Sequence, residues 1–192
     1  MASAASTSSD RGFSLLEVTI AIGILTVVAL GVAQLIAMSA MANHLAKAQT
    51  SNMAEAVEKM EQLRGLTWGY DTSALGLPLT DTTTDLSVDP PDHNGSGLLP
   101  SPSNALTANV PGYVDYLNAS GQWVGNSDQP PDDASYIRRW SVEGLPDDPL
   151  NTLVLQVLVR TMDEEQAARQ SGRAHAPGEA RLVSLKTRKA QP

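Results

Sequence analysis

Three residues near the start of the chain have types and a spacing that suggest chemistry: Gly12, Phe13 and Glu17. Glu17 is the single charge in an apolar block that begins abruptly at Phe13. From residue 18 to residue 46 no side chain carries a formal charge when His44 is neutral. A carboxylate near the edge of the hydrocarbon region costs on the order of 2–3 kcal/mol on insertion scales. Glu17 must therefore either snorkel to the lipid headgroups or find a partner of opposite charge.

The apolar block is long enough to cross a membrane. About 20 apolar residues span a bilayer as a helix, and residues 18–36 are Ala, Val, Ile, Leu, Gly and Thr with one Gln. Three alternatives are a secretory signal cut at Ala40-Met41-Ala42, an unprocessed signal anchor, and a buried helix of a soluble protein. The first is disfavoured because the apolar region of such signals runs about 7–15 residues. Orientation has weak support, because Asp10 offsets Arg11 before the span.

Residues 12–21, GFSLLEVTIA, resemble the processing site of type IV prepilins and pseudopilins. The resemblance implies a leader peptide at residues 1–12, which prepilin peptidase removes by cutting between Gly12 and Phe13. It also implies N-methylation of Phe13 and retention of Glu17 as the fifth residue of the mature chain. The implied partners are prepilin peptidase, other pilins or pseudopilins bound through the N-terminal helix, and the inner membrane before assembly.

Processing of this kind creates a charge that Glu17 can use. When subunits stack, the carboxylate of Glu17 can meet the Phe13 ammonium of a neighbouring subunit, and such a pair is far stronger in a low dielectric than in water. A subunit out of register would leave a buried charge unpaired, so the pair also fixes the axial register. Gly12 suits the scissile position because it lacks a side chain that would restrict the backbone.

Two features bear on the subclass. Major pilins often carry a proline about two thirds along the membrane segment, whereas this chain has Gln34 there and no proline before Pro78. That pattern resembles minor pilins and pseudopilins, and residues 138–140, Arg-Arg-Trp, resemble the type IV pilus modification (PilV-type) minor pilins. The resemblance implies a minor pilin with a single inner-membrane span and a periplasmic head, later part of a pilus or pseudopilus. The alternatives are a minor pseudopilin of a type II secretion system and a membrane-anchored periplasmic binding module.

Composition excludes several classes. The chain has 192 residues, 20.3 kDa, a formal net charge of −8 and no cysteine. Disulfides, thiol nucleophiles and Cys-ligated metals are therefore excluded, and nucleic acid is not an expected partner. The net charge is −1 over residues 1–64, −10 over residues 65–159 and +3 over residues 160–192. The acidic middle and the basic tail could pair with each other or with neighbouring chains, or form separate solvated faces.

We expect no enzyme activity, no cofactor and no metal. The sequence has no cysteine nucleophile, no nucleophile elbow, no phosphate loop and no dinucleotide fingerprint. Four acids, Asp81, Asp85, Asp89 and Asp92, lie in a segment rich in Pro, Gly, Ser and Thr. Their spacing is not that of an EF-hand. Calcium stays an alternative, and a solvated acidic loop is the favoured interpretation.

One helix is expected over residues 13–64, and it would be roughly 78 Å long at 1.5 Å per residue. Residues 13–42 form its membrane and assembly half, and residues 43–65 form an amphipathic half. Glu55 and Lys59 are expected to pair on the solvent side of that second half. The expected buried face consists of Met53, Val57 and Met60, flanked by Leu45, Ala56 and Leu63.

A loop at residues 66–112 is expected to connect the helix to a β-sheet head at residues 113–192. The expected strands are residues 113–117, 122–124, 136–142, 152–160 and 181–187. In the fourth, Leu153, Leu155, Val157 and Val159 alternate toward the core.

A short helix is expected between the last two strands, with a start box at Asp163 and Gln166 and an end near Gly172. For Arg138 and Arg139 an ordinary sheet surface is favoured over a DNA contact. The sequence thus predicts an α+β protein, with a long helix packed on a small antiparallel sheet.

Overall fold

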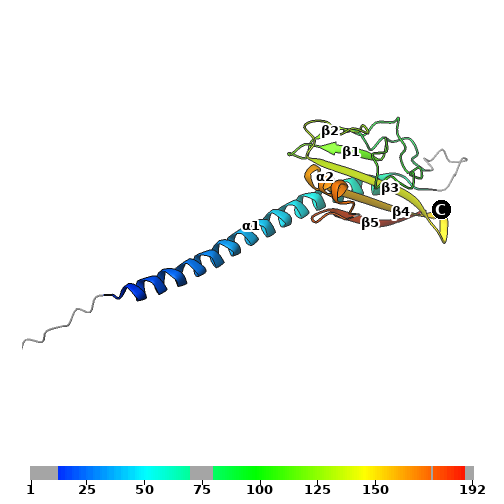
Figure 1. Ribbon diagram of the computed structural model, residues 1–192. Helices are drawn as coiled ribbons and strands as arrows, with labels where there is room; N and C mark the ends of the chain where they lie inside the picture. The colour runs from blue at the N-terminus through cyan, green and yellow to red at the C-terminus, as the bar shows by residue number, and fades with distance from the viewer. Residues whose placement is uncertain (1–12, 70–79, 174, 189–192) are drawn as a thin grey trace, which may run out of the picture. The chain divides into compact units, whose positions relative to one another are not determined.

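The computed structural model describes residues 13–69, 80–173 and 175–188. The chain divides into two compact units, Met1–His44 and Leu45–Pro192, and helix α1, Leu15–Gly65, contributes to both (Figure 1). The predicted long helix is therefore confirmed. The leader predicted at residues 1–12, which includes Gly12, lies outside the described residues.

The second unit is built on an antiparallel sheet of five strands in the order β2-β1-β3-β4-β5 (Figure 1). Its strands are β1 (Val114–Leu117), β2 (Trp123–Gly125), β3 (Tyr136–Leu145), β4 (Asp148–Thr161) and β5 (Ala180–Thr187). The predicted α+β class is confirmed. Strands β3 and β4 are longer than predicted, because their polar ends pair with each other up to a hairpin tip at Leu145 and Asp148.

One face of the sheet packs against the second half of α1. Ala56, Met60 and Leu63 are at most 5% exposed and form a core with the sheet. Because side chains alternate across a strand, every second residue of β4 reaches this core. The predicted inward residues of β4 are buried, at 2% exposure or less: Leu153, Leu155, Val157 and Val159.

The buried face of α1 differs from the predicted one. Met53 and Val57 are 38% and 46% exposed, whereas Asn52 and Lys59 are buried. The amide nitrogen of Asn52 donates to the carbonyl of Gly178 at 2.9 Å. The prediction is confirmed for Ala56, Met60 and Leu63 and wrong for Met53, Val57 and Leu45. The apolar pattern alone does not show which polar side chains find partners inside the head.

A buried ion cluster joins α1 to the sheet. Nζ of Lys59 lies 2.8 Å from Oδ2 of Asp115, and Arg138 holds the same carboxylate through Nε at 2.7 Å and Nη2 at 2.8 Å. Lys59 therefore does not pair with Glu55 in solvent, and Arg138 is not ordinary sheet surface. Glu55 instead lies 3.6 Å from Nη1 of Arg138. Nζ of Lys59 also lies 4.6 Å from the ring centroid of Trp140, a cation–π distance.

Burial is the largest single influence on the pKa values of Lys59, Glu55 and Arg138 in this cluster. It lowers the pKa of Lys59, although the Asp115 carboxylate opposes the shift. Burial also raises the pKa of Glu55 against the opposing charge of Arg138. For Arg138 the effect of burial is outweighed by the hydrogen bonds and charge of Asp115, and its pKa is raised. Removing one member of the cluster would leave a buried charge without its partner, which is strongly destabilising.

The described part of the acidic loop, residues 80–112, contains neither a helix nor a named strand, but it is packed rather than simply solvated. Leu86 and Leu98 are 4% and 2% exposed and belong to the core. The carboxylate of Asp81 accepts hydrogen bonds from the backbone of Thr83 and Thr84. Asp81, one of the four acids considered as calcium ligands, thus stabilises a local turn. Among the described residues, no group of three or more His, Asp or Glu side chains could hold a metal.

Helix α2, Met162–Ser171, lies against the other face of the sheet. Its capping box is formed by Thr161 and Glu164, not by the predicted Asp163 and Gln166. Thr161 takes the cap because it is the last residue of β4 and still has an extended backbone, with φ −70° and ψ 156°. The predicted end is confirmed, because Gly172 adopts the left-handed conformation at φ 63°.

Candidate functional site

The predicted processing and assembly residues that the structure describes, Phe13 and Glu17, lie at the start of α1. Phe13 is 83% exposed and precedes the helix, which begins at Leu15. Ser14 caps that helix: its Oγ accepts from the backbone N–H of Leu16 at 3.2 Å, and its carbonyl accepts from Val18 at 3.1 Å. Glu17 lies in the first turn, where a negative charge is favourable near the helix N-terminus.

Ser14 is a helix-capping residue that the sequence analysis did not predict. A Ser followed three residues later by Glu, just before an apolar run, is a sequence signal of a helix start. Residues 14–17 have that pattern. The cap fixes where the helix begins, and so it sets the number of helical residues between Phe13 and Glu17.

Glu17 lies in apolar surroundings of the first unit. Phe13, Val18 and Leu25 are among the residues that line the same shallow hollow on the helix surface as Glu17. Within residues 13–69, 80–173 and 175–188, Glu17 makes no ion pair. The carboxylate is therefore available to a partner from outside the chain.

The segment that follows Glu17 presents apolar side chains all round. Every residue from 13 to 47 is exposed. An 18-residue window of α1 has a mean hydropathy of 2.5 and is not buried at all, so by length and composition the helix can cross a membrane. A helix that is hydrophobic all round needs lipid or other helices around it.

A comparison with protein-family models finds the Prokaryotic N-terminal methylation motif at residues 7–33. The matched range contains Phe13, Ser14 and Glu17 as well as the first half of the apolar segment. The match supports a type IV prepilin or pseudopilin class of protein, whose members are structural subunits. No curated protein and no solved structure matches the chain.

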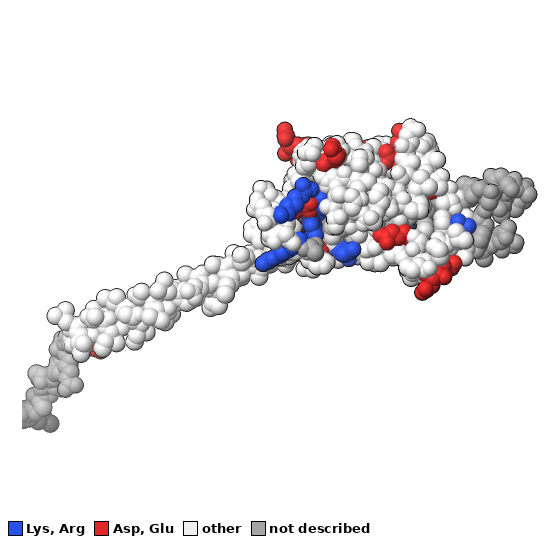
Figure 2. Space-filling model, turned by 45° about the vertical axis from the view of Figure 1, so that its right-hand side comes forward, with Lys and Arg blue, Asp and Glu red and all other residues white. Residues whose placement is uncertain are grey.

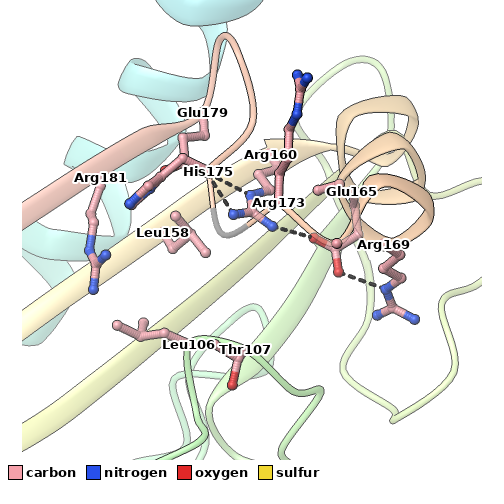
Figure 3. Close-up of a pocket in the computed structure, with 12 residues that line it drawn as sticks. Leu106, Thr107, Leu158, Arg160, Glu165, Arg169, Arg173, His175, Glu179 and Arg181 are labelled. Carbon is pink, nitrogen blue, oxygen red and sulfur yellow. Dashed lines mark hydrogen bonds and ion pairs between the residues drawn. The ribbon is translucent and has the colours of Figure 1, made fainter.

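A second candidate site lies at the far end of β4, between α2 and the loop that precedes β5. A cavity of about 330 Å³ is lined by four arginines and two glutamates, with Leu106, Leu158 and Ala168 among its apolar residues (Figure 3). The arginines are Arg160, Arg169, Arg173 and Arg181, and the glutamates are Glu165 and Glu179. One feature of the sequence indicated it, the positive net charge of residues 160–192.

Glu165 is the centre of this cluster. Its Oε1 accepts from Arg139 at 2.6 Å and from Arg169 at 2.8 Å, and its Oε2 accepts from Arg160 at 3.0 Å. Burial would raise the pKa of Glu165, but the hydrogen bonds from Arg139 and Arg169 outweigh it and lower the pKa to about 2. Arg139 is only 1% exposed, so the prediction of an ordinary sheet surface was wrong for both arginines of that pair.

The side chains of Arg138 and Arg139 lie on opposite faces of the sheet. Successive side chains on a strand point to opposite sides, and β3 accordingly sends Arg138 to Asp115 and Arg139 to Glu165. The Arg-Arg pair therefore ties the sheet to α1 on one face and to α2 on the other.

Proposed function

We propose that the chain is a minor pilin: a non-enzymatic subunit of a type IV pilus that prepilin peptidase cuts between Gly12 and Phe13 and N-methylates at Phe13. The observation that carries the proposal is the carboxylate of Glu17 in the first turn of an exposed apolar helix, four residues after an exposed Phe13. The methylation motif over residues 7–33 supports the same proposal independently of the geometry.

The mechanism follows from the charges. Cutting before Phe13 leaves a positive amino group next to an apolar helix. In the filament this group of one subunit meets the carboxylate of Glu17 in a neighbour, where water is scarce and the attraction is strong. Apolar helix surfaces pack around the pair. The matched charges therefore select one axial register, because any other register buries both of them alone.

We infer that the chain crosses the inner membrane once before assembly, with unit Leu45–Pro192 as a periplasmic head. The exposed apolar segment 13–44 supports the span. The ion cluster of Lys59, Asp115 and Arg138 supports a head that stays folded when α1 leaves the lipid, because the anchoring contacts of α1 belong to the head itself.

A variant at the scissile position tests the processing step. A Gly12→Val change introduces a branched side chain next to the scissile bond, and we expect the 12-residue leader to remain attached. The matched control is Ala5→Val, which adds a similar side chain within the leader and should not affect cleavage. Gel mobility in cells that contain the peptidase distinguishes the two forms. A Gly12→Val chain that is still shortened would overturn the leader assignment.

A minor pseudopilin of a type II secretion system is the second candidate. The absence of proline from the sequence before Pro78 favours it equally. Deletion of the coding region separates the two: loss or change of surface pili supports the pilus subunit, and loss of exoprotein secretion with normal pili supports the pseudopilin.

A further inference from the structure

The arginine-lined cavity has more positive than negative charge. Both of its glutamates are already occupied, because Glu165 holds Arg139, Arg160 and Arg169, and Glu179 accepts from Arg160 at 2.6 Å. Figure 3 shows Arg160 between the two carboxylates, with Arg169 bound to Glu165 through Nε only. The glutamates thus hold Arg160 and Arg169 in place without neutralising the cavity, which Arg173 and Arg181 also line.

The outer guanidinium groups of the cavity are accessible. The side chain of Arg169 is 60% exposed, and Arg173 and Arg181 are exposed as well. Between them the cavity has an apolar surface, to which Leu158 and Ala168 contribute. A ligand that suits it combines an aliphatic side chain with one or more carboxylates.

The opposite end of β4, where it forms a hairpin with β3, carries a segment with this chemistry. The β3–β4 hairpin turns at Pro146 and Asp147, and Leu150 follows it with 72% exposure. Glu143 and Asp147 are also exposed. Twelve residues of β4 separate Asp148 from Arg160, which is about 40 Å at 3.3 Å per residue. The acidic tip and the basic cavity therefore lie at opposite ends of one rigid element.

The hairpin tip is preformed. Pro146 and Pro149 restrict its backbone. A Cβ atom on Gly144 would lie 2.9 Å from Cβ of Pro149, so the glycine allows the two strand ends to approach closely. A tip that is already ordered loses little conformational freedom when it docks.

We propose that the cavity binds the β3–β4 hairpin tip of a second copy of this chain, with Leu150 on the apolar surface and Asp147 and Glu143 at the exposed arginines. The contact joins two different surfaces at opposite ends of the head. Heterologous contacts of this kind build a ring when the rotation between subunits closes and an open filament when it does not, and in an open filament all subunits point the same way. The inference goes beyond the proposed function, which concerns only the N-terminal helix.

A short acidic segment fits better than a long polyanion. Figure 2 shows most of the visible basic residues gathered toward one end of the head, a few basic atoms at its other end, and acidic residues at several places on the visible face. Residues 65–159 carry a net charge of −10, so a nucleic acid that extends beyond the cavity would meet like charge. The hairpin tip would touch the cavity alone.

Cross-linking between copies tests this contact. Because the sequence has no cysteine, the introduced cysteines are the only thiols that can react. The full chain in detergent carries Thr107→Cys at the cavity in one tagged population and Pro146→Cys at the tip in another. A short bismaleimide should join the two populations about tenfold more efficiently than it joins Thr107→Cys with Ser120→Cys, an exposed turn residue of the same head. Equal efficiency in the two mixtures would overturn the proposal. The control pair also measures the background from helices that associate in the micelle.

Charge-reversal variants then identify the charged residues that form the contact. Arg173→Glu with Arg181→Glu on the cavity copy, or Glu143→Arg with Asp147→Arg on the tip copy, should each reduce the cross-link to the control level. Combining both reversals should restore it. Failure of the combination to restore the cross-link contradicts the proposal, as does capture of a short oligonucleotide by the cavity in place of the tip. The experiment needs no peptidase and no pilus, so its failure would leave the processing proposal standing.

Discussion

The two units of the chain treat charge in opposite ways. In unit Leu45–Pro192 the buried ionic groups are paired: Lys59 and Arg138 share Asp115, and Arg139 and Arg160 share Glu165. In unit Met1–His44 the described residues are exposed and almost entirely apolar, and Glu17 makes no ion pair within the described part of the chain.

This difference shows which unit is complete. The head buries an apolar core and pairs its buried charges by itself. The apolar helix surface of the first unit is larger than soluble monomers expose without a partner, and among the described residues Glu17 has no counter-charge. The first unit therefore needs lipid or other helices around it, whereas the second unit requires neither for its core.

The largest expected effect comes from removing the unmatched charge. A Glu17→Leu change makes the span more apolar, so membrane insertion and leader cleavage should persist. Incorporation into pili should fall by a hundredfold or more, because an amino group left alone in an apolar environment typically costs about 3–5 kcal/mol. Thr19→Val, which also removes a polar group from the span, is the control. Immunoblots of sheared pili and of membranes measure both steps, and normal incorporation of the Glu17→Leu chain contradicts the pairing mechanism.

Removing a paired charge from the head should affect the stability of the fold. Asp115→Asn leaves Lys59 and Arg138 without their shared carboxylate, and the free energy of unfolding should drop by about 3–5 kcal/mol. Asp133→Asn, at an exposed position, should change it by less than about 0.5 kcal/mol. Urea unfolding of the full chain in detergent, followed by Trp fluorescence, measures both variants. Equal midpoints would mean that the cluster does not anchor α1.

The pH dependence of the head gives a smaller effect. The pKa of Glu165 is lowered to about 2 in the folded protein, from an ordinary value of 4.5 for a glutamate side chain. Because the folded-state pKa is depressed, the stabilisation is fully present above about pH 4.5 and is lost as the pH falls toward 2. The loss is on the order of 3 kcal/mol. Urea midpoints measured across this range should fall for the native chain and much less for Glu165→Gln. Parallel curves for the two chains would contradict the assignment.

Much of the fold follows from local pattern. The alternation of Leu153, Leu155, Val157 and Val159 predicted β4 and its buried face, and a long run without proline predicted α1. These features depend on the periodicity of a single element, which the sequence displays directly.

The ionic contacts were not predictable in the same way. Lys59 and Asp115 are 56 residues apart, and Arg139 meets Glu165 across 26 residues. Local spacing suggested Glu55 as the partner of Lys59, but tertiary packing overrode it. The roles proposed for Phe13 and Glu17 stay predictions, and they could be made because a processing signal is read from short contiguous sequence, whereas the cavity combines α2, β4 and β5.

The N-terminus of the mature chain tests the central claim most directly. We expect tandem mass spectrometry of protein purified from membranes of its source cells to find a first residue of N-methylated Phe13, followed by Ser14-Leu15-Leu16-Glu17. That result means that the peptidase has created the amino group which Glu17 needs. A chain that begins at Met1 is an unprocessed anchor, and one that begins at Asn43 is a secreted protein; either start contradicts the account.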